Sequence, residues 1–172
     1  MDMAKLIESL ERFGNLLPAV VQGVSIEDAR WRPPNGAWSV LEVVCHLADE
    51  EVADFRARLE STLRAPDEPW KANDPEAWAV ERRYNEQDLK DVLARFTAER
   101  RQSVGWLRTL AEPDFSRTYQ HPKFGPIQAG DIMVSWAAHD MLHLRQIAKR
   151  LFQMAQRDGQ GFSSAYAGEW KA

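Results

Sequence analysis

The chain has 172 residues, and its 22 Lys and Arg against 26 Asp and Glu leave a formal net charge of −4. This length fits one domain with a sizeable core, and Lys and Arg nowhere cluster densely enough to follow a nucleic-acid backbone or an anionic membrane. A single cysteine, Cys45, cannot form an internal disulfide, and no stretch is long and apolar enough to span a membrane. We therefore expect a soluble, cytoplasmic protein with neither nucleic acid nor membrane as a partner.

Two long helices are predicted in the first part of the chain. Apolar residues at helical spacing indicate one from about Asp2 toward Pro18, where the proline can kink the helix or open a short second piece. The second begins at Ser39-Val40-Leu41-Glu42, a capping box in which the Ser39 hydroxyl accepts from the Glu42 amide and the Glu42 carboxylate reaches back to the cap. Its apolar face continues to about Arg64.

Two further long helices are predicted in the second half. Asn85 can cap a helix that runs to Ala111 and ends before Pro113. Helical spacing of apolar residues returns from Ala129 to Gln153.

The connections between these helices are longer than a minimal bundle requires. Prolines interrupt residues 65–74, a short helix is expected near 75–82, and residues 112–128 mix Pro, Gly and polar residues as a loop does. No apolar run alternates strictly with polar residues, so strands are expected to be absent or trivial. The predicted fold is all-α, a four-helix bundle with long inter-helix loops over residues 1–153, followed by a C-terminal tail, 154–172.

Three of the four histidines lie inside predicted helices, His46 on the second and His139 and His143 on the fourth. Residues four apart on a helix share a face, and stepping along each core seam points all three imidazoles into the bundle. On the second helix this seam continues through Glu50 to Ala53. Neutral imidazole binds late divalent metals well, and three such ligands leave a coordination position open. The pattern predicts an open metal site, although each histidine alone could be a hydrogen-bonded core residue.

Two other metal patterns fit the sequence poorly. Di-iron bundles need Glu-x-x-His on two helices, but Glu42 precedes His46 by four positions, and the fourth helix has no glutamate before His139. The segment His139-Asp140-Met141-Leu142-His143 is similar to the His-Glu-x-x-His of zinc proteases. Asp140 replaces the general-base glutamate, however, and no further histidine follows to complete that site.

Two segments surround the three histidines. They are Trp-Ser-Val-Leu-Glu-Val-Val-Cys-His-Leu-Ala-Asp-Glu over 38–50 and Ala-His-Asp-Met-Leu-His-Leu-Arg-Gln-Ile over 138–147. Together they resemble the DinB-like family, also called DinB/YfiT-like metalloenzymes. The resemblance extends roughly from the first helix to Leu151. It implies a four-helix bundle, a divalent metal held by His46, His139 and His143, and a homodimer. It also implies a divided function, because some members look like hydrolases without an assigned substrate and others transfer low-molecular-weight thiols or use them as cofactors.

Four more residues are candidates for the site. Asp49 and Glu50 follow His46 by three and four positions, where a carboxylate could orient an imidazole, ligate the metal or take a proton; a solvated acidic pair is the alternative. Gln146 could bind a ligand or a neighbouring histidine, or make only an interhelical contact. Trp38 could line a substrate cleft, with core packing as the alternative.

Two features are expected to lie outside the chemistry. Cys45 precedes His46 by one position and so points about 100° away from it around the helix. It is interpreted as a core residue. Glu99, Arg100 and Ser103 interrupt the apolar face of the third helix, and a solvent-facing or ion-paired role is favoured over pocket lining.

Two hypotheses for function follow. In the first, the protein is a metal-dependent enzyme in which zinc or nickel activates water for hydrolysis or a small thiol for transfer to a small-molecule substrate, with Asp49 or Glu50 as the proton acceptor. In the second, the bundle binds a metal or ligand without turnover, as a sensor or stress-related scaffold.

Overall fold

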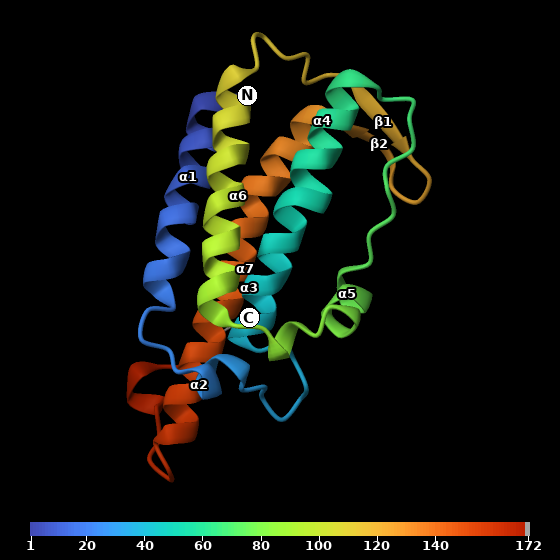
Figure 1. The fold of residues 1–172 in the computed structure, drawn as a ribbon. Helices are drawn as coiled ribbons and strands as arrows, with labels where there is room; N and C mark the ends of the chain where they lie inside the picture. Colours follow the sequence, from blue (N-terminus) through green and yellow to red (C-terminus); the bar gives the residue numbers. More distant parts are fainter. Residues whose placement is uncertain (171–172) are drawn as a thin grey trace.

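The computed structural model describes residues 1–170 and shows a bundle of four long helical segments (Figure 1). These segments are α1 (Met3–Val20), the continuous run of α3 (Val40–Glu50), η1 (Glu51–Arg56) and α4 (Ala57–Arg64), α6 (Leu89–Thr109) and α7 (Ala129–Asp158). Helices α1 and α3 each pack against both α6 and α7, so α6 and α7 face each other across the bundle. The predicted four-helix bundle is confirmed.

Short elements fill the connections. They are α2 (Ile26–Arg30), α5 (Pro75–Glu81), η2 (Tyr84–Glu86), β1 (Thr118–His121), β2 (Gly125–Gln128) and η3 (Ala165–Ala167). Strands β1 and β2 form one antiparallel hairpin in which Thr118 pairs with Gln128 and His121 with Gly125. Helix α5 packs against α3 and lies beside the bundle (Figure 1). None of the described helices is long and apolar enough to cross a membrane.

Helix boundaries differ from the sequence prediction at three points. Helix α1 continues through Pro18 to Val20 without a second piece. Helix α6 is capped by Asp88, not Asn85, because the Asp88 carboxylate accepts hydrogen bonds from the amides of Lys90 and Asp91. Helix α7 ends at Asp158, beyond Gln153, so the predicted division between bundle and tail falls inside a helix; residues 171–172 of that tail lie outside the described residues.

The core consists of two hydrophobic clusters stacked along the bundle axis. One contains Phe13, Leu17, Phe96 and the buried face of α3, and the other contains Leu10, Leu59, Met133 and Trp136. The segment α3–α4 and helices α6 and α7 each contribute apolar residues to both clusters. In each of them, buried or half-buried polar residues lie between the apolar residues of one cluster and those of the other. We call these residues the polar layer: His46, Asp49, Glu50, Glu51, Asp54, Arg100, Ser103, His139, Asp140 and His143.

Candidate metal centre

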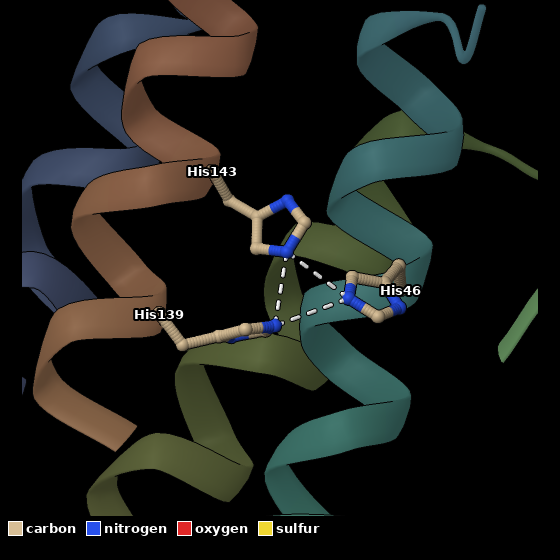
Figure 2. A group of neighbouring side chains, drawn as sticks. All are labelled: His46, His139 and His143. Carbon is tan, nitrogen blue, oxygen red and sulfur yellow. Dashed lines mark hydrogen bonds between the residues drawn. The ribbon is translucent and has the colours of Figure 1, made fainter. Parts of the chain in front are cut away.

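Three histidine side chains converge in the polar layer. The Nε2 atom of His46 lies 3.3 Å from Nε2 of His139 and 3.1 Å from Nε2 of His143, and the last two are 2.9 Å apart. Figure 2 shows His46 reaching from α3 and the other two reaching from successive turns of α7 toward one point. The structure therefore brings together the three residues that the sequence singled out as a metal-ligating set.

The start of α3 is held by the capping box that the sequence predicted and by one further contact that it did not. The Ser39 hydroxyl accepts from the Glu42 amide at 3.2 Å, and the Glu42 carboxylate accepts from the Ser39 amide at 2.9 Å. Arg32 donates its Nε–H to the same carboxylate at 2.8 Å. Because the helix begins at a defined residue, its period places His46 on the interior face two turns later.

The three nitrogens fit a divalent metal ion. Tetrahedral zinc with bonds of about 2.0–2.1 Å to imidazole places its ligand nitrogens about 3.3–3.4 Å apart, close to the spacing found here. The Nδ1–H of His143 donates to Gln146 Oε1 at 2.8 Å, which leaves a lone pair on His143 Nε2. Neutral imidazoles that turn lone pairs toward one point repel each other, and a cation at that point gives all three a partner.

Burial keeps these rings in the form that binds metals. Desolvation, followed by the charge of His143, lowers the pKa of His46 to about 3. Burial lowers the pKa of His139 and of His143 as well, and the hydrogen bond to Gln146 opposes part of that effect at His143. All three imidazoles are neutral near pH 7, which is the ligand form.

Gln146 and Trp38, both predicted beside the site, line a cleft that reaches His143. The cleft has a volume of about 840 Å³, within the usual range for small-molecule sites. The Trp38 ring lies 5.1 Å from the His46 ring, measured between centroids. The remaining lining is strongly polar and includes Arg32, Glu42, Glu76, Arg83, Asn85 and Glu86.

Asp49 is buried, but other side chains occupy its carboxylate. Arg82 donates to one oxygen at 2.6 Å, Arg95 donates to the other at 2.5 Å, and the Tyr84 hydroxyl also donates. Burial raises the pKa of Asp49, yet the hydrogen bonds from Tyr84 and Arg95 outweigh burial and hold the pKa below its usual value. Asp49 thus joins α3 to the segment around α5 and to α6.

Glu50 has a different environment. Its carboxyl group is buried, its Oε1 atom has no hydrogen-bond partner among the described residues, and burial followed by the neighbouring Asp54 carboxylate raises its pKa. Asp54 itself accepts from Arg58 at 2.7 Å and from the Asn73 amide. Sequence reasoning missed Asn73, because it lies in an irregular connection with no helical period to indicate its direction.

The expectations about residues outside the chemistry are confirmed except at Ser103. Cys45 is fully buried, and burial raises the pKa of its thiol to about 12. Glu99 is ion-paired with Arg56, but Ser103 is fully buried and accepts from Arg56, so it neither faces solvent nor forms an ion pair.

Arg100 is ion-paired, with both Asp140 and Glu51 as partners. Because Arg100 binds both oxygens of Asp140, that carboxylate has no free oxygen for the general-base role of a zinc protease.

A helical bundle with three histidines around one point defines a class of metal-site bundles. The model of the family described as the DinB superfamily matches residues 9–147, and the chain belongs to this superfamily.

Two curated relatives carry similar names. A protein of Oceanobacillus iheyensis named "Putative metal-dependent hydrolase OB0782" is 28% identical over 141 residues, which cover 82% of this chain and 81% of that protein. A Bacillus subtilis protein named "Putative metal-dependent hydrolase YfiT" is 26% identical over 152 residues, covering 86% and 84%.

The fold also matches a solved structure. The structure of Bacillus subtilis YfiT, described as "a probable metal-dependent hydrolase with an unusual four-helix bundle topology", superposes with a TM-score of 0.80 at 23% identity, covering 89% of this chain and 87% of that one. This likeness confirms the fold.

Proposed function

We propose that the protein is a metal-dependent enzyme in which His46, His139 and His143 hold one zinc or nickel ion beside a small-molecule cleft. The observation that carries the proposal is the meeting of the three Nε2 atoms within 3.3 Å of one another. The names of the two curated relatives support the metal-dependent part of it. A cytoplasmic location and a homodimer remain predictions.

The bound ion supplies a Lewis acid that lowers the pKa of water, or of a small thiol, toward neutrality. Gln146 Oε1 holds the proton on His143 Nδ1, so the Nε2 lone pair stays directed at the site. Glu50 Oε1, buried and without a partner among the described residues, is assigned as the acceptor of the nucleophile's proton. A cation held by the three histidines would lower the raised pKa of the Glu50 carboxyl group and leave it ionised for this role. Trp38 limits the access of bulk solvent from the cleft side and positions the substrate.

Hydrolysis with water as the nucleophile is the first candidate reaction, and transfer of a low-molecular-weight thiol is the second. The size of the cleft is compatible with thiol transfer, because a volume of about 840 Å³ has room for a thiol together with an acceptor molecule. Asp49, whose oxygens are bound to two arginines and Tyr84, is assigned a structural role, and Glu50 the role of proton acceptor.

Elemental analysis of purified protein tests the proposal. Wild-type protein is expected to contain stoichiometric zinc or nickel, and His143→Ala to lose it. His121→Ala, which removes a histidine in β1 outside the cluster, serves as the matched control and is expected to retain the metal. Equal metal content in wild type and His143→Ala would refute the site.

Glu50→Gln separates binding from catalysis. The variant is expected to retain the metal and to lose activity by about 10²-fold or more on any ester, amide or thiol-transfer substrate that the wild type turns over. Metal-loaded wild-type protein that is inactive across all three panels would favour the second hypothesis, a bundle that binds without turnover.

A further inference from the structure

Arg100 on α6 connects the two helices that carry the three histidines. Its Nη1 and Nη2 atoms donate to the two oxygens of Asp140 at 2.6 and 2.9 Å, and its Nε donates to Glu51 Oε2 at 3.0 Å. Asp140 directly follows His139 on α7, and Glu51 directly follows the last residue of α3. One planar guanidinium thus spans the interior of the bundle and binds both ligand-bearing helices.

Two more contacts restrict this arrangement. Trp136 on α7 donates its indole N–H to Glu51 Oε2 at 3.1 Å, so Glu51 bridges to α7 directly as well. Arg100 Nη1 also donates to the carbonyl oxygen of Leu10 on α1 at 3.0 Å. From α6, the guanidinium therefore contacts all three other long segments of the bundle, which are α1, the α3–η1–α4 run and α7.

Stability alone does not explain this cluster. The Arg100 residue is 2% exposed, and Glu51 and Asp140 are each 1% exposed. Glu51 Oε1 has no hydrogen-bond partner among the described residues. Buried ion clusters of this kind can often be replaced by well-packed hydrophobic residues of similar volume without loss of stability, because desolvation offsets the attraction. What the cluster supplies is geometry, since the fork of a guanidinium fixes the carboxylates it binds in distance and direction.

Gly14 on α1 makes room for the Arg100 side chain. A Cβ atom at Gly14 would lie 2.8 Å from Arg100 Cγ, closer than real contacts allow. Gly105 on α6, by contrast, faces open space, with no atom within 4 Å of a Cβ built there. The absence of a side chain at Gly14 therefore makes space for Arg100, whereas no side chain occupies the space next to Gly105.

We propose that Arg100 is a positioning residue for the histidine cluster. By holding Asp140 and Glu51 together, it sets the separation of α3 and α7 at which His46 Nε2 meets His139 Nε2 and His143 Nε2. Gly14 contributes because it has no side chain that would displace the aliphatic part of Arg100 from this conformation. This inference rests on the proposed metal site, and the protein's affinity for Zn²⁺ is its readout.

Gly14→Ala tests the inference without changing any charge or any residue that touches the histidines. Zn²⁺ affinity is measured by competition with a chromophoric chelator, and stability by urea unfolding. The variant is expected to bind Zn²⁺ about 10-fold more weakly or worse, the effect seen when an outer contact of a metal ligand is disturbed. Gly105→Ala, the matched control, makes the same helical substitution and is expected to leave the affinity unchanged.

A charge-neutral variant separates positioning from stability. Arg100→Met alone would leave two buried carboxylates without a cation and is expected to unfold. The combination of Arg100→Met, Glu51→Gln and Asp140→Leu removes the charges of the whole cluster, and Gln at position 51 still offers an acceptor to the Trp136 indole N–H. It is expected to unfold near the wild-type urea midpoint, yet to bind Zn²⁺ about 10-fold or more weakly. Adding Gly14→Ala to it is expected to cause no further loss, because an untethered Met side chain can rotate away.

Each outcome decides the question. Wild-type Zn²⁺ affinity in Gly14→Ala, or in the stable charge-neutral variant, would overturn the positioning role while leaving the metal site intact. A wild-type protein whose Zn²⁺ binding does not depend on His143 would overturn the proposed function and this inference together.

Discussion

Four acidic side chains of α3 and η1, Asp49, Glu50, Glu51 and Asp54, are buried in the polar layer, each at most 8% exposed. Three of them bind arginine: Asp49 binds Arg82 and Arg95, Glu51 binds Arg100, and Asp54 binds Arg58. Glu50 binds none, and its Oε1 atom is without a partner among the described residues. Burying a carboxyl group in this way costs stability, so the presence of Glu50 in the polar layer, one helical turn after His46, is best explained by chemistry.

The contribution of Asp49 to stability should depend on pH. Its pKa in the folded protein lies below the usual value of about 3.9, so the carboxylate stabilises the fold above that value and the gain is lost as the pH falls through the folded pKa. Asp49→Asn is expected to lower the free energy of unfolding by about 2 kcal/mol near pH 7, and by much less near pH 2.5. Urea unfolding of both proteins at the two pH values measures this; an equal difference at both would contradict it.

The π-helical segment η1 changes the phase of the helix that carries His46. Regular stepping from His46 and Glu50 predicts that Ala53 faces the interior, but in the structure Ala53 is half-buried and Asp54 is buried. A π turn contains an additional residue, so the interior face moves along by one position. As a result Asp54 lies next to Glu50. In α4, which follows, Leu59 is buried in the core.

The capping box of α3 should contribute measurably to stability. The Ser39 hydroxyl accepts from the Glu42 amide and donates to Asn85 Oδ1 at 2.7 Å, and both contacts are buried or half-buried. Ser39→Ala is expected to lower the free energy of unfolding by about 1–2 kcal/mol in urea titrations. Ser135→Ala, at an exposed position of α7, is the control and is expected to change it by less than about 0.5 kcal/mol. Equal losses in both variants would contradict the role of the cap.

At the scale of the whole molecule, the polar layer divides the hydrophobic core into two clusters. The histidine set joins α3 to α7 across this layer, through residues 93 and 97 positions apart in the chain. A metal ion held there would link the two helices in the folded state and has no such site in the unfolded chain, so binding adds to the stability of the fold.

Zinc should therefore raise the melting temperature. At free zinc about 100 times the dissociation constant, binding adds about 2.7 kcal/mol, which corresponds to roughly 5–11 °C for a chain of this size. EDTA should reverse the shift, and His143→Ala should show none. Differential scanning calorimetry measures it, and a shift of the same size in His143→Ala would show that zinc acts elsewhere on the protein.

Much of the fold and the centre of the site could be predicted from local patterns. Helical periodicity and the capping box at Ser39 are properties of a few consecutive residues. The cap shows where the helix begins, and the periodicity then shows which side chains face the interior. This reasoning was sufficient for the four-helix bundle and for the inward direction of His46, His139 and His143. The contact of Gln146 with His143, three positions away, is local in the same sense.

Contacts between distant segments could not be predicted in this way. Which arginines bind Asp49, and that Asn73 binds Asp54 from an irregular connection, depends on where separate segments pack. The same holds for Arg100, whose partners lie 49 and 40 positions away on α3–η1 and α7. Periodicity gives the direction of a side chain relative to its own helix; the partner it meets there is set by the packing of the whole chain, in which burial makes unpaired charges costly.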